Sequence, residues 1–164
     1  MKARTTPPAT AATTARPLLL SLRPRFAEAI LDGVKTIELR RTRVSAPPGT
    51  KLVLYASAPT MAVVGVATLL DVQTSTPGQI WRRHRRHVCV SKAEYDDYFA
   101  GADLATAISI SAPERLAAPH TLAALRAATG FRPPQSYRYL SELDPEVLHE
   151  AAADSLYPRN ACKL

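Results

Sequence analysis

The segment DGVKTIELRRTR, residues 32–43, brings charged side chains of both signs together in a pattern typical of a β-strand. Ile37 and Leu39 take one phase of that strand, and Glu38 and Arg40 take the other. On one strand face the α-carbons of Glu38 and Arg40 would lie about 7 Å apart, within range for their side chains to pair or to bridge one ligand. From the residues alone, this face is either solvated or the wall of a charged cleft.

A second charged segment is WRRHRRH, residues 81–87, which we call the arginine segment. Guanidinium groups bind phosphates in a bidentate manner, and an aromatic ring beside them can stack on an unpaired base. We expect Trp81 to lie in the core. The arginines form either a nucleic-acid contact surface or a solvated face; they are Arg82, Arg83, Arg85 and Arg86. His84 and His87 have no acidic or sulfur partner nearby in the sequence, so we predict no metal site here.

The composition excludes several classes of protein. The formal net charge of +7 and a pI of about 9.8 favour an anionic partner, of which nucleic acid is the commonest. No P-loop, dinucleotide fingerprint or nucleophile elbow is present. Cys89 and Cys162 lack the paired spacing of zinc ligands, and we expect Cys89 to be buried or unreactive. No apolar run is long enough to span a membrane, so we expect a cytoplasmic protein that does not bind membranes.

The chain is long enough for one domain with a real core. Residues 1–17 are rich in Thr, Ala and Pro, with basic but no acidic side chains, and are predicted to be a disordered basic leader. The folded domain is predicted over residues 18–140. Residues 141–164 should form a C-terminal helix, started by Asp144 and Pro145, and a tail.

The predicted elements alternate without any repeat. Strands are expected at residues 18–24, 35–41, 50–58, 61–74, 105–110 and 136–140, and helices at residues 25–33, 91–101 and 122–130. Ser91 and Glu94 form a capping-box pattern, and Gly33 suits a left-handed helix end. Gly65 suits a bulge or a sharp bend in its strand. The fold class is therefore α+β, with short helices inserted between the strands of a small curved sheet.

The motif G-x-K-x-x-E-x-R, here GVKTIELR at residues 33–40, resembles the signature of the ASCH domain, a member of the PUA-like superfamily. LSLRPRFAEAILDG, LVLYASAPTMAVVG, SKAEYDDYFAG and FRPPQSYRYL are similar to other elements of its bacterial and archaeal branch. The resemblance implies a PUA-like mixed β-pseudobarrel, with a cleft beside the first helix. Ligand-binding residues carried over from the motif are Gly33, Lys35, Glu38 and Arg40. Lys35 shares the strand phase of Ile37, so it reaches the cleft only from the helix-to-strand turn.

The resemblance also implies a choice of functions. Binding of RNA or a nucleotide in the cleft is the main expectation, and cleavage of single-stranded RNA is the alternative. For cleavage, Lys35 would stabilise the pentacoordinate phosphate and Glu38 would act as the base toward a 2′-hydroxyl. No cofactor is expected, although a ribonuclease could hold a divalent metal weakly through the substrate phosphates. Amide hydrolysis on a modified nucleoside is disfavoured, because Glu38 stands where that group of the family has a threonine.

Overall fold

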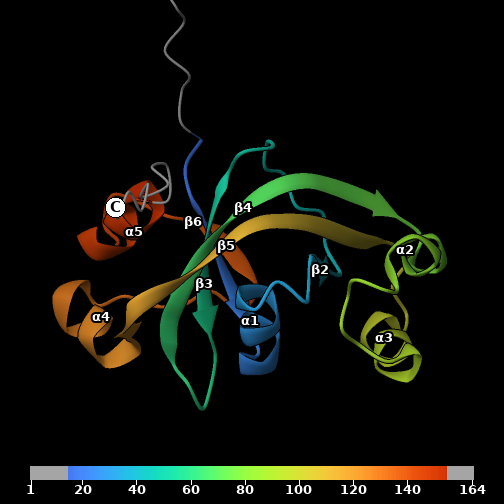
Figure 1. Ribbon diagram of the computed structural model, residues 1–164, viewed down its shortest axis with the longest axis horizontal. Helices are drawn as coiled ribbons and strands as arrows, with labels where there is room; N and C mark the ends of the chain where they lie inside the picture. Colours follow the sequence, from blue (N-terminus) through green and yellow to red (C-terminus); the bar gives the residue numbers. More distant parts are fainter. Residues whose placement is uncertain (1–14, 155–164) are drawn as a thin grey trace, which may run out of the picture.

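A computed structural model describes residues 15–154, which form one mixed six-stranded sheet with helices packed around it (Figure 1). The strands are β1 (Leu18–Leu22), β2 (Ile37–Arg40), β3 (Lys51–Ala56), β4 (Ala62–Ser75), β5 (Ala105–Thr121) and β6 (Tyr137–Tyr139). The helices are α1 (Pro24–Leu31), α2 (Pro77–His84), α3 (Lys92–Phe99), α4 (Leu122–Thr129) and α5 (Glu146–Asp154). The predicted α+β class is confirmed, and the sheet curls into a half-barrel. The predicted leader lies almost wholly outside the described residues, as do Cys162 and the C-terminal tail.

The strand order is β2-β5-β4-β3-β1-β6. Only β1 and β3 pair in parallel, which is possible because α1 and β2 separate them in the chain. All six residues of β3 are buried, as expected for a strand in the middle of a sheet. β2, which carries the signature residues, is an edge strand paired only with β5.

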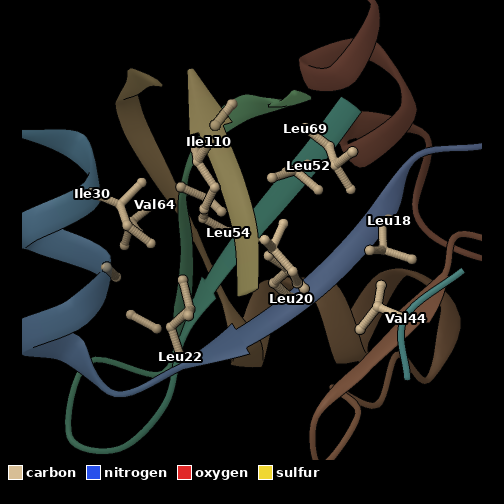
Figure 2. Close-up of a cluster of buried hydrophobic side chains, with 14 of the residues drawn as sticks. Leu18, Leu20, Leu22, Ile30, Val44, Leu52, Leu54, Val64, Leu69 and Ile110 are labelled. Atoms are coloured by element: carbon tan, nitrogen blue, oxygen red, sulfur yellow. The ribbon is translucent and has the colours of Figure 1, made fainter. Parts of the chain in front are cut away.

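Side chains alternate between two cores, one on each face of the sheet. Leu52 and Leu54 of β3 pack with Ile30 of α1 in the first core (Figure 2). Val53, between them in the chain, points to the opposite face and packs with side chains of α4 and α5, including Leu148. α5 thus shares a core with the sheet although it follows the last strand. No helix in the described part of the chain is long and apolar enough to cross a membrane.

A third core holds β2 against α2 and α3. Ile37 and Leu39 lie on the same face of β2 and contact a group that includes Ile80 and Tyr95. In Figure 1, α2 and α3 lie together at the end of the molecule opposite α4. This core therefore takes the apolar phase of β2 and leaves Glu38 and Arg40 on the other face.

The turn between α1 and β2 sets where Lys35 lies. Pro24, the last residue of the strand predicted over residues 18–24, lies instead in the first turn of α1. Gly33 has φ of +74°, the left-handed conformation predicted for it. The backbone N–H groups of Val34 and Lys35 both donate to the carbonyl of Ala29. The chain thereby folds back against α1, and Lys35 lies before the first residue of β2.

Two elements differ from the predictions. β5 is 17 residues long, whereas residues 105–110 alone were predicted as strand. The remaining residues of β5 were not predicted as strand because they include Pro113 and Pro119, and proline is disfavoured in central strands. Both prolines lie where the pairing of β5 with β4 shifts register. α2 was not predicted as a helix, although Thr76 caps it and Pro77 stands in its first turn.

Gly65 is predicted to be intolerant of a side chain. A β-carbon there would lie 2.4 Å from Leu31 Cδ2 and 2.7 Å from the backbone oxygen of Glu114, next to a register shift between β4 and β5. We expect Gly65→Ala to lower the free energy of unfolding by about 1–3 kcal/mol, because backbone must move. Urea denaturation measures this. Gly78→Ala is the control, since open space surrounds that position, and a loss of stability equal to that of Gly65→Ala would contradict the steric account.

Candidate functional site

A pocket of about 610 Å³ opens between α1, β2 and α3. Lys35, Glu38 and Arg40, which the family resemblance implies as ligand-binding residues, contribute to its lining, whereas Gly33 does not. Gly33 is exposed at the end of α1 and shapes the turn that carries Lys35. The charged face of β2 is consequently the wall of a cleft and not a solvated surface.

Lys35, Glu38 and Arg40 form a buried charged cluster, which we call the triad. Lys35 Nζ lies 3.4 Å from Glu38 Oε2, and Arg40 Nη2 lies 3.1 Å from Glu38 Oε1. The side chains of all three are less than a tenth exposed. Each carboxylate oxygen therefore faces one cation, and the triad keeps a net charge of +1. Of the two alternatives for Glu38 and Arg40, pairing or bridging of one ligand, the structure shows the pair.

Lys35 reaches the pocket from the turn, as its motif position required. Its Nζ donates to the backbone oxygen of Val88 at 2.6 Å and lies 4.8 Å from the centre of the Phe26 ring. The carbonyl of His87 accepts from the backbone N–H groups of Thr36 and Ile37. The residues after α2 therefore hold both the lysine and the start of β2 in place.

Arg40 connects the triad to distant parts of the chain. Its Nη2 donates to the backbone oxygen of Ser21 at 3.1 Å, and its Nη1 donates to Ser136 Oγ at 3.3 Å. Its Nε is buried and has no hydrogen-bond partner. Buried donors are nearly always paired, so this N–H is an exception within the cluster. Sequence reasoning missed Ser21 and Ser136, because nothing in the chain connects residues so far apart.

The mouth of the pocket carries further charges and aromatic rings. Arg25 of α1 pairs with Glu94 of α3 at 2.5 Å. Burial, reinforced by Asp96, raises the pKa of Tyr95 to about 12, and its hydroxyl donates to the Pro77 carbonyl. Burial also raises the pKa of Tyr98, a residue that is 43% exposed and whose ring packs edge-on against Phe99. Both phenols therefore stay protonated at neutral pH.

The arginine segment covers the end of α2 and the loop after it, and its four arginines are exposed and outside the pocket lining. Trp81 is only half-buried, packing against the third core with its ring centre 4.8 Å from that of Tyr95. His84 Nε2 lies 3.1 Å from Gln73 Oε1. Cys89 is exposed, so the expectation of burial was wrong. Among residues 15–154, no group of three His, Cys, Asp or Glu residues could hold a metal ion.

Family comparison agrees with this geometry. The model of the ASCH domain family matches residues 20–114. This chain belongs to the ASCH domain family. Its six-stranded half-barrel is accordingly an ASCH, PUA-like fold, as predicted.

Several curated proteins and solved structures are similar to this chain. An ASCH domain-containing ribonuclease of Zymomonas mobilis is 35% identical over 133 residues, covering 79% of this chain and 88% of the relative. The crystal structure of ASCH from Zymomonas mobilis has a TM-score of 0.73 at 32% identity, covering 77% of this chain and 89% of that one. The crystal structure of a serine-to-alanine mutant of ZmASCH, also from Zymomonas mobilis, has a TM-score of 0.76 at 30% identity, covering 84% of this chain and 96% of that one. A hypothetical protein from Leishmania major, at 11% identity and a TM-score of 0.52 over 90% of this chain and all of that one, shares the fold alone.

The triad predicts a large stability effect at Glu38. Glu38→Gln leaves Lys35 and Arg40 as buried cations without a counter-charge, and we expect the free energy of unfolding to fall by about 3 kcal/mol. Lys35→Met in the same chain should restore part of that loss, because it removes one of the unpaired charges. Denaturant titration of both single variants and the double variant measures the coupling.

The control is Glu28→Gln, which removes an ion pair to Arg115 between half-exposed side chains. That loss should stay below about 1 kcal/mol. Equal losses for Glu28→Gln and Glu38→Gln would show that burial of the triad carries no special energetic weight.

Proposed function

We propose that this protein is a ribonuclease that binds single-stranded RNA in the pocket of the triad. The observation that carries the proposal is a buried cluster of net charge +1 in the wall of an open pocket. A phosphodiester carries one negative charge and several acceptor oxygens, so it complements this cluster. The relative from Zymomonas mobilis, described as a ribonuclease, supports cleavage over binding alone.

The scissile phosphate lies toward Lys35 and Arg40. A carboxylate repels a phosphate placed directly on it, so Glu38 is directed at a different part of the nucleotide. Arg40 exchanges one of its contacts, to Ser21 or Ser136, for a phosphate oxygen, and Lys35 acts as a compact charge beside it. Both cations stabilise the extra charge that develops on the phosphate in the transition state.

Glu38 acts on the ribose 2′-hydroxyl. It accepts the 2′ proton as the 2′ oxygen forms a bond to the adjacent phosphorus and the bond from phosphorus to the 5′ oxygen breaks. Water then protonates the departing 5′ oxygen, and the first product is a 2′,3′-cyclic phosphate. This role requires Glu38 to exchange part of its pairing with Lys35 or Arg40 for the hydroxyl, because both carboxylate oxygens are engaged in the free protein. DNA lacks the attacking group, so it should bind without being cut.

Binding without turnover is the second candidate function, and one observation favours it. Because each carboxylate oxygen of Glu38 faces one cation, Glu38 is well placed to fix the positions of Lys35 and Arg40 or to accept hydrogen bonds from a base edge. In that case both cations and Glu38 serve only as ligand contacts.

The decisive measurement follows cleavage and retention of end-labelled single-stranded RNA together, with Mg²⁺ and with chelator. We expect Lys35→Ala and Glu38→Gln to reduce cleavage by about 10²–10⁴-fold, with far less effect of Glu38→Gln on affinity. Arg40→Lys should give an intermediate loss, since lysine keeps the charge and loses the planar fork. Arg126→Ala, an exposed arginine of α4, is the control and should leave cleavage unchanged.

A substrate with a single 2′-deoxy residue at the cleaved position provides the chemical control, and it should bind but resist cleavage. Circular dichroism of each variant verifies folding before activity is compared. Absence of cleavage by the wild-type protein under all metal conditions would exclude the ribonuclease. The binding function would then stand if Lys35→Ala weakened RNA retention.

A further inference from the structure

Four exposed arginines at the end of α2 and in the following loop lack acidic partners. Within residues 15–154, none of the ion pairs involves them; they are Arg82, Arg83, Arg85 and Arg86. By contrast, Arg25, Arg40, Arg115 and Arg138 each pair with a carboxylate. We call the four the arginine surface. Like charges placed this close repel each other, and a polyanion relieves the repulsion.

The arginine surface continues directly into the wall of the pocket. The His87 carbonyl accepts from the start of β2, the Val88 carbonyl accepts from Lys35, and Val90 lines the pocket itself. Val90 follows Arg86 by four positions, so their α-carbons lie at most about 14 Å apart. One bound strand can therefore contact both places.

The neighbouring rings do not add base recognition to this surface. The ring of Trp81 packs on Tyr95 and lies under Lys92 Nζ at 5.6 Å. Burial, followed by the charge of Arg83, lowers the pKa of His84, so His84 is neutral at pH 7. The positive charge of the surface therefore comes from guanidinium groups, which contact phosphates without reading sequence.

We infer that the arginine surface binds the phosphate backbone of the same RNA strand whose scissile phosphate occupies the pocket. The inference rests on the proposed function and specifies its substrate class: single-stranded oligonucleotides that reach both places, in preference to dinucleotides or free nucleotides. The arginines then act on the capture of substrate and not on the chemical step, so they set KM and the salt dependence while the triad sets kcat.

The test compares two charge-matched variants on two substrates. Arg85→Ala with Arg86→Ala removes two charges beyond the end of α2, leaving the helix intact. Arg126→Ala with Arg132→Ala removes two exposed charges near α4, at the far end of the molecule (Figure 1). Each is assayed for kcat and KM on a 20-nucleotide single strand and on a dinucleotide, across a range of salt concentrations.

For the Arg85, Arg86 variant we expect KM on the 20-mer to rise about three- to tenfold with kcat unchanged. The slope of log affinity against log salt should flatten by about 1.4, because each lost phosphate contact on a single strand removes about 0.7. Neither parameter should change on the dinucleotide. The Arg126, Arg132 variant should match the wild type on both substrates.

Three results would overturn the inference: equal effects of the two variants, an equal loss on the dinucleotide, or an unchanged salt slope. An equal loss on the dinucleotide would mean that the loop acts only by holding Lys35. If the wild-type protein binds RNA without cleaving it, the proposed ribonuclease fails by itself. The salt slope of 20-mer binding, measured by fluorescence anisotropy, then decides the role of the arginine surface.

Discussion

The burial of one carboxylate between two cations is the constraint on which the site depends. Glu38 points inward from an edge strand, and a buried charge of this kind persists only if it is paired. Lys35 supplies one partner because the turn after α1 folds the chain back before β2 begins. Arg40 supplies the other from the same face of the strand. Together they leave one net positive charge in the wall of an open pocket.

The four residues of β2 alternate between two environments, the third core and the pocket. Ile37 and Leu39 pack under α2 and α3, whereas Glu38 and Arg40 line the pocket. Because Ile37 and Leu39 are held against the helices, Glu38 and Arg40 must point to the opposite face, toward the pocket. The segment between β4 and β5 provides that packing, and its loop also binds Lys35 through the Val88 carbonyl. The segment between β4 and β5, which carries α2 and α3, is therefore part of the structure that positions the site.

Local chemistry made much of the fold predictable. The left-handed Gly33 and the capping box of Ser91 and Glu94 depend on neighbours close in the chain, and both are present. The register shift beside Gly65 is also present, although the contacts that exclude a side chain there come from Leu31 and Glu114. The second half of β5 was missed because Pro113 and Pro119 weaken its strand pattern, and pairing with β4 compensates for them. The exposure of Cys89 was missed because nothing in its neighbours sets which way the loop turns.

The sequence by itself determined the family and the fold class, and its alternation placed Glu38 and Arg40 on one face of a strand. The family motif added Lys35, which reaches that face from the turn before β2. Tertiary structure decided how those residues are paired. Ser21, Ser136 and Val88 contact the triad from places between 19 and 96 residues away in the chain. Whether Arg40 Nε finds a partner, and whether Glu38 faces one cation or two, depends on how β1, β2 and the loop after α2 converge. Such long-range geometry follows from packing of the whole sheet, which no local pattern encodes.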